Sequence, residues 1–161
     1  MKKYELTEET VTVYGKTLYR IRAVRDFGSV KTGDLGGYIE KEENLSHSGN
    51  AWVYGNAWVS SNAYVSGNAW VSGNAKVSGN AEVFNTRHFF VQGPIGSRNE
   101  FVTFYRTKDN TVGVRCGCFS GSLQEFVNQV ERTHGGSRYE KEYKLAAELA
   151  KVCIRLEEES K

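Results

Sequence analysis

Polar side chains that could bind an anion gather in the last third of the sequence. Arginine, serine and asparagine occur there in glycine-rich turns and beside the expected start of a helix. Backbone N–H groups at a helix N-terminus attract phosphate or carboxylate groups, and arginine adds paired hydrogen bonds. Tyrosines in the same region could stack a nucleotide base. We therefore expect a binding site formed by Ser97, Arg98, Asn99, Tyr105, Arg106, Arg115, Ser120, His134 and Arg138.

The Cys116-Gly117-Cys118 motif leaves two further alternatives open. Thiolates here could bind zinc together with His134 and Cys153. Cys118 and His134 could instead form a nucleophile and its base. A Cys-x-Cys spacing is a weak signal, however, and Cys153 falls on the apolar side of an expected helix, as a buried cysteine would. We therefore predict no metal, no cofactor and no catalytic residue.

Two hairpin strands and two helices are expected to position these residues. Strands over about 101–106 and 112–116 flank the turn signal Asp109-Asn110. Ser122 and Glu125 form a capping box at the start of a helix that His134-Gly135-Gly136 ends. A second helix is expected from about Arg138 to about Glu157. The acidic tail at its end carries negative charge, which is unfavourable beside the negative end of the helix dipole.

The middle of the chain carries a six-residue repeat. Between Ser48 and Val83, Ala-x-Val triplets alternate with corners that are mostly Gly-Asn. An alanine and a valine on either side of one variable residue have the in-out-in pattern of a short strand, and Gly-Asn tolerates the positive φ of a tight corner. The pattern predicts a strand and a corner every six residues.

These Asn-Ala repeats resemble the hexapeptide-repeat left-handed β-helix proteins, in particular small bacterial and phage members labelled polymer-forming or cytoskeletal. The resemblance implies a mainly β fold: a left-handed parallel β-helix of about three coils with an N-terminal β-hairpin and a small C-terminal α/β cap made of a hairpin and two helices. Its expected parts are residues 1–36, 37–90 and 91–161. In the first coil, Ile39 and Leu45 are expected where alanine stands later.

The N-terminal part is expected to begin with a hairpin. Residues 10–14 and 17–24 alternate as strands around Gly15-Lys16, and a glycine-rich passage leads from there into the repeat.

Three hexads per coil would place residues 18 apart above one another. Large aromatic side chains would then project from the faces of the coil, which is typical of an interface. We expect an oligomer, with a homotrimer as the first choice by resemblance. The alternative is that the terminal segments of the same chain cover these rings. The expected interface residues are Trp52, Trp58, Tyr64 and Trp70.

Charge and composition exclude several classes of protein. The formal charge is +2, so no broad basic surface indicates a duplex nucleic acid or an anionic membrane as partner. No stretch resembles a signal peptide or a membrane span, and we expect a cytoplasmic protein, in the host cell if a phage encodes it.

The sequence favours a non-enzymatic oligomer that holds a small anionic ligand, expected to be a nucleotide, in cap or inter-subunit pockets. By resemblance to phage proteins, it could sequester a host-defence nucleotide signal. The alternative is a structural or protein-interaction module. Acyl transfer, known for this scaffold, and nucleotide cleavage are less favoured because the histidines near the repeat, His47 and His88, lie at its two ends.

Overall fold

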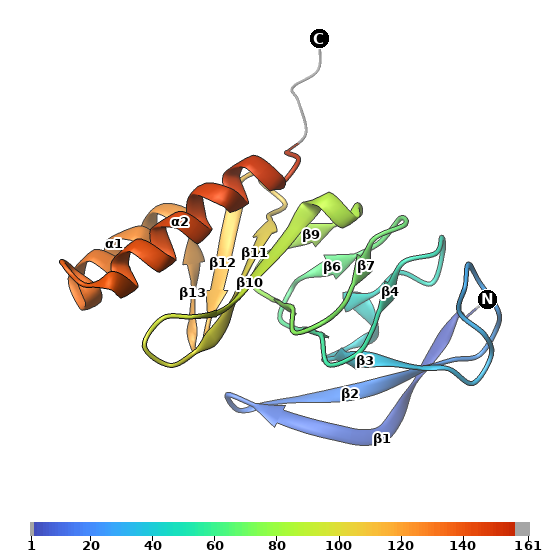
Figure 1. The fold of residues 1–161 in the computed structure, drawn as a ribbon. Coiled ribbons are helices and arrows are strands. Elements are labelled where there is room, and N and C mark those ends of the chain that lie inside the picture. Colours follow the sequence, from blue (N-terminus) through green and yellow to red (C-terminus); the bar gives the residue numbers. More distant parts are fainter. Residues whose placement is uncertain (1, 157–161) are drawn as a thin grey trace, which may run out of the picture.

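An antiparallel hairpin begins the described part of the chain, which in this computed structural model is residues 2–156 (Figure 1). Strands β1 (Tyr4–Val13) and β2 (Lys16–Ala23) pair around a turn in which Tyr14 and Gly15 both have positive φ. This confirms the predicted hairpin. Strand β2 also pairs with β3 (Leu35–Ile39), a strand within the passage expected to be a glycine-rich connection.

The hexapeptide repeat forms six strands of two residues each. They are β4 (Trp52–Val53), β5 (Trp58–Val59), β6 (Tyr64–Val65), β7 (Trp70–Val71), β8 (Lys76–Val77) and β9 (Glu82–Val83). Each pairs in parallel with the strand 18 residues along: β4 with β7, β5 with β8 and β6 with β9. The predicted stacking of residues 18 apart is confirmed, and the repeat alanines and valines are buried as expected.

The prediction of a left-handed parallel β-helix of about three coils is wrong. Within residues 2–156 there is no single regular parallel solenoid, and the strands belong to separate sheets. One is a mixed sheet in the order β1-β2-β3-β5-β8, two are parallel pairs, and one is a four-stranded antiparallel sheet. The physical reason is that two-residue strands make only short ladders, while the N-terminal hairpin adds antiparallel strands to one of them.

The register of the lead-in also differs from the prediction. Ile39 pairs with Val59, and Leu45 pairs with Val65, so both occupy valine positions of the repeat instead of alanine positions. Gly37 takes the alanine position, where a Cβ would lie 2.4 Å from the carbonyl oxygen of Ala57. The close approach of the backbones there leaves no room for a side chain.

The C-terminal cap is an antiparallel sheet covered by two helices (Figure 1). Its strands are β10 (Phe89–Ile95), β11 (Glu100–Arg106), β12 (Val112–Cys116) and β13 (Phe119–Ser122), and its helices are α1 (Leu123–His134) and α2 (Arg138–Cys153). The β11–β12 hairpin and the Ser122–Glu125 capping box are confirmed. Strand β10 begins where the end of the repeat was expected, and strand β13 lies where a connector was expected. Helix α2 ends four residues before Glu157, and the predicted acidic tail from Glu157 on lies outside the described residues.

The cap sheet closes the end of the repeat. The backbone N–H of Lys76 donates to Thr103 Oγ1 at 2.9 Å, and Arg106 Nη1 donates to the carbonyl oxygen of Glu82 at 3.1 Å. Backbone groups on the last strands of the repeat are thereby satisfied by the cap. Two short 3-10 helices, Glu42–Asn44 and Thr86–His88, lie before and after the repeat.

The aromatic residues of the repeat are only partly available to a partner. Trp52 is 1% exposed and Trp58 is 6% exposed, because other parts of the same chain cover them. Phe27 packs edge-on against Trp52 at 5.1 Å, and Arg115 lies over the ring of Trp58. Both rings are therefore covered within the chain, which is the alternative of intramolecular cover, and they are not available as an exposed interface. Tyr64 and Trp70 remain accessible.

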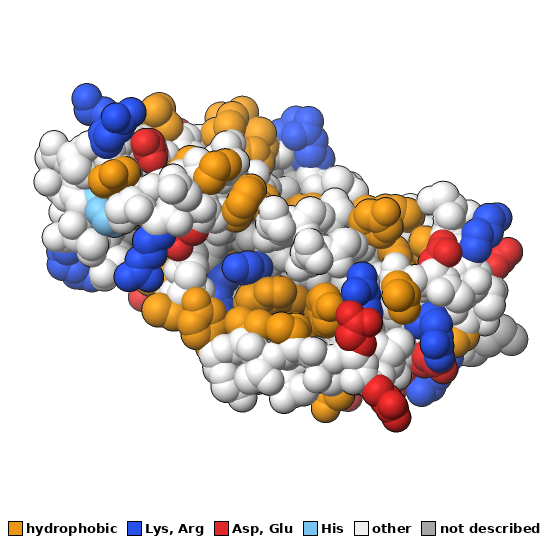
Figure 2. Space-filling view, turned by 60° about the horizontal axis from the view of Figure 1, so that its bottom comes forward, with side chains coloured by type: hydrophobic (Ala, Val, Ile, Leu, Met, Phe, Trp, Pro, Cys, Tyr) orange, Lys and Arg blue, Asp and Glu red, His pale blue; other side chains and the backbone are white. Residues whose placement is uncertain are grey.

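The face seen from the hairpin side carries a band of hydrophobic side chains (Figure 2). The band lies between the cap and the N-terminal hairpin, with basic side chains beside it. Among the described helices, none is both long enough and apolar enough to cross a membrane.

Candidate functional site

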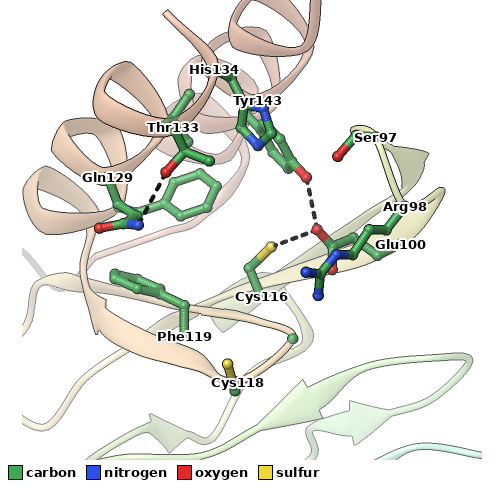
Figure 3. A pocket seen from close by; sticks show the side chains of 13 residues that line it. Ser97, Arg98, Glu100, Cys116, Cys118, Phe119, Gln129, Thr133, His134 and Tyr143 are labelled. Carbon is green, nitrogen blue, oxygen red and sulfur yellow. Dashed lines mark hydrogen bonds between the residues drawn. The ribbon is translucent and has the colours of Figure 1, made fainter.

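A cavity of about 310 Å³ lies in the cap between the strands and the helices (Figure 3). The β10–β11 turn, the β12–β13 turn, α1 and α2 all contribute to its wall. The side chains that line it mix aromatic rings with polar and charged groups. They include Ser97, Arg98, Glu100, Cys116, Cys118, Phe119, Phe126, Gln129, Thr133, His134 and Tyr143.

Glu100 is the centre of a hydrogen-bond network in this cavity. The Tyr143 hydroxyl donates to Glu100 Oε1 at 2.7 Å, and the Cys116 thiol donates to the same oxygen at 3.3 Å (Figure 3). Burial, and then the Glu100 carboxylate, raise the pKa of Cys116 to about 12. Burial and the hydrogen bond to Glu100 also raise the pKa of Tyr143. Both groups keep their protons at neutral pH, which leaves Cys116 a poor nucleophile.

Arg98 and His134 are the basic side chains of this cavity. Arg98 is exposed in the turn between β10 and β11 and forms no hydrogen bond or ion pair with another described residue. His134 ends α1, and its ring lies 5.4 Å from that of Tyr143. An unpaired guanidinium at the rim of a partly apolar cavity can bind an anionic group of a ligand.

A glycine allows the β10–β11 turn to approach α2. Gly96 has a φ of +80°, and a Cβ at this position would lie 1.9 Å from the Tyr143 hydroxyl oxygen. The N–H of Gly96 donates to Glu142 Oε1 at 2.7 Å. This contact holds the turn that carries Ser97 and Arg98 beside the cavity.

The structure brings together three of the nine predicted ligand-binding residues: Ser97, Arg98 and His134 all line the cavity. Arg115 lies in a neighbouring cavity, where its guanidinium is over the rings of Tyr14 and Trp58.

The other five predicted residues lie elsewhere. Tyr105 is buried against the repeat, and Arg106 is buried with its guanidinium 5.0 Å from the ring of Phe84. Asn99 and Ser120 are exposed outside the cavity wall. Arg138 is 81% exposed, and its Nε lies 3.8 Å from Glu142 Oε2.

The metal and nucleophile alternatives gain no support from the placement of the cysteines. Cys116 and Cys118 line the cavity with His134, whereas Cys153 lines a separate groove beside β10. Cys118 and His134 lie at opposite ends of the cavity (Figure 3). In the part of the chain that the structure describes, no three histidine, cysteine or acidic side chains are grouped as metal ligands would be.

Sequence reasoning missed most of the apolar wall and the central carboxylate. Phe119 and Phe126 pack at 5.8 Å between ring centroids, and neither was expected at a site. Glu100 and Tyr143 are 43 residues apart, and nothing local marks them as partners. The apolar stripe of the first helix was recognised, but a stripe does not tell which of its residues border a cavity.

No family model matches this chain. A protein named "Uncharacterized acetyltransferase YdcK" from Escherichia coli (strain K12) is 37% identical over 62 residues. The match covers 34% of this chain and 19% of the relative, so the chain spans less than a fifth of that protein. This similarity is compatible with a hexapeptide-repeat protein.

Proposed function

We propose that the protein is a non-enzymatic binding protein that holds a small anionic ligand, a nucleotide, in the cap cavity. The observation that carries the proposal is the unpaired Arg98 at the rim of a cavity whose wall contains Phe119 and Phe126. Arginine suits the phosphate, and aromatic surface suits the base. A volume of about 310 Å³ lies at the lower end of the range for small-molecule sites.

The chemistry of the cavity supports binding over cleavage. The Cys116 thiol has a pKa of about 12, and the Glu100 carboxylate already accepts hydrogen bonds from Cys116 and Tyr143. Because the thiol keeps its proton and the carboxylate already accepts two hydrogen bonds, neither group is set up to attack a ligand. A bound ligand should therefore stay intact. Sequestration of a host-defence nucleotide by a phage is the setting we propose for such a protein.

Arg98→Ala tests the proposal. Wild-type protein should unfold at a higher temperature in the presence of a binding nucleotide from a panel of AMP, GMP, ADP and GDP, since a ligand of the native state stabilises it. Arg98→Ala should bind about 10- to 100-fold more weakly by titration calorimetry, because a charge-assisted contact contributes roughly 1.5–3 kcal/mol.

Arg138→Ala is the matched control, because Arg138 lies outside the cavity wall and should leave the affinity unchanged. Ligand recovered after denaturation should be intact. Cleaved product would identify an enzyme instead, and the absence of binding by the whole panel would refute the nucleotide proposal.

Acetyl transfer, the activity in the name of the E. coli relative, is a less favoured proposal. His47 Nδ1 accepts from the backbone N–H of Lys3 at 3.0 Å, and the His47 ring stacks on Tyr4. His88 Nδ1 accepts from the backbone N–H of Phe84 at 3.2 Å. Both histidines hold the ends of the repeat, which disfavours their use as a general base.

A second candidate function is a protein-interaction module, favoured by the outer face of α2. Leu145 and Val152 are each 70% exposed on this helix, and Leu149 lies between them. Lys141 and Glu148 are exposed and lie two helical turns apart on the same side of α2, so an antiparallel second copy would set these opposite charges against each other. We propose another copy of this chain as the occupant, tested by its state of association in solution.

A further inference from the structure

A second, smaller cavity of about 160 Å³ lies where the N-terminal hairpin, the repeat and the cap meet. Two aromatic residues, Tyr14 and Trp58, and two basic residues, Lys16 and Arg115, contribute to its wall. It therefore offers the same two kinds of surface as the first cavity, aromatic rings and a guanidinium.

Arg115 is held in place in this cavity but keeps part of its hydrogen-bonding capacity. Its guanidinium carbon lies 5.1 Å from the ring centre of Tyr14 and 5.2 Å from that of Trp58. Its Nε donates to the carbonyl oxygen of Gly117 at 2.8 Å. Its two Nη atoms form no hydrogen bond with any described residue, so they can donate to an anionic group.

The two cavities meet at the β12–β13 turn. Cys118 lines both of them. Gly117 has a φ of +58°, and a Cβ there would lie 3.4 Å from Glu100 Oε2, in the wall of the first cavity, and 3.9 Å from the Tyr14 hydroxyl oxygen, in the wall of the second. Because residue 117 is a glycine, it places no side chain of its own between these walls.

We infer that the two cavities form one continuous site, and that its ligand is a dinucleotide with two aromatic heterocycles joined through phosphate. This inference rests on the proposed function. One heterocycle binds against Phe119 and Phe126, and the other enters the second cavity beside the Arg115 guanidinium, which lies over the rings of Tyr14 and Trp58. The linking phosphate passes the turn at Gly117.

Titration calorimetry with four probes tests the inference. AMP and GMP each carry one heterocycle, whereas linear pApA and pGpG carry two. The preferred dinucleotide should bind wild-type protein at least tenfold more tightly than its mononucleotide. Gly117→Asn should remove this advantage, so that the dinucleotide binds this variant no more tightly than its mononucleotide does, because asparagine tolerates positive φ and places a side chain between the cavities.

Gly136→Asn is the matched control. Gly136 has a φ of +81°, and a Cβ at this position would meet no atom within 4 Å, so this variant should keep the dinucleotide advantage. Equal affinity of wild-type protein for mono- and dinucleotides would overturn the two-cavity inference while leaving the proposed function intact. Retention of the advantage in Gly117→Asn would also overturn it. Binding of none of the four probes would refute both.

Discussion

At the scale of single residues, a buried lysine near the N-terminus has an unusual setting. Lys3 has no exposed surface, and its Nζ donates to the carbonyl oxygen of Ala51 at 2.6 Å. The same Nζ lies 4.7 Å from the ring centre of Phe27. Burial, and then the charge of Arg25, lower the pKa of Lys3 from 10.5 to about 8. The cation is therefore less stable in the folded chain than in the unfolded one.

Stability should depend on pH through Lys3. Because its pKa is lower in the folded state, the unfolded state binds more protons between pH 8 and 10.5, and the free energy of unfolding rises with pH across this window. The stability that the chain gains when the Lys3 amine is neutral is fully present above pH 10.5, and it is lost as the pH falls through 8 and the buried amine takes up a proton. Urea unfolding should show the free energy of unfolding of wild type rising, relative to that of Lys3→Met, by up to about 3 kcal/mol from pH 8 to pH 10.5.

Lys2→Met is the control for the Lys3 experiment. Lys2 is exposed and pairs with Glu42 at the surface, so its replacement should not reproduce the slope. A difference between wild type and Lys3→Met that stays constant from pH 8 to 10.5 would contradict the buried setting of this amine.

At the scale of secondary-structure elements, the approach of the β10–β11 turn to α2 depends on Gly96. Gly96→Ala should cost about 2–4 kcal/mol of unfolding free energy, from the positive φ and from overlap with Tyr143. It should also weaken nucleotide binding, because Ser97 and Arg98 follow in the same turn.

Gly136→Ala separates these two causes. Gly136 has nearly the same φ as Gly96, +81°, and a Cβ at this position would meet no atom within 4 Å. Only the backbone cost of about 1 kcal/mol should therefore remain. Chemical denaturation measures both variants. Equal losses in the two variants would show that contact with Tyr143 contributes nothing.

Elements with strong local signals could be predicted from the sequence, and those formed by distant pairing could not. The capping box of α1 and the β1–β2 hairpin are local patterns, and both were confirmed. Strand β13 was missed because its Gly121 and serines resemble a connector, and its pairing with β12 makes it a strand. The cavity was only partly predicted for the same reason: Arg98 stands in a recognisable glycine-rich turn, whereas Tyr143 reaches Glu100 through tertiary packing.

At the scale of the whole molecule, association should depend on α2. If a second copy packs on this helix, sedimentation velocity will show a concentration-dependent dimer. Leu145→Glu should abolish it, since a charge would be buried in an apolar contact. Gln124→Glu, an exposed change of similar charge on α1, should leave it intact. A dimer that survives Leu145→Glu would exclude this face, and a trimer would favour the repeat faces that carry Tyr64 and Trp70.

The parallel pairing of residues 18 apart makes the length of the molecule adjustable. Three further hexads would add one strand to each ladder and would move the N-terminal hairpin away from the cap by one strand spacing, about 4.8 Å. Tyr14 belongs to the hairpin and Arg115 to the cap, yet both border the same small cavity. Under the proposed binding across both cavities, the number of hexads would therefore set the length of ligand that fits, and chains with more or fewer repeats would select ligands of different span.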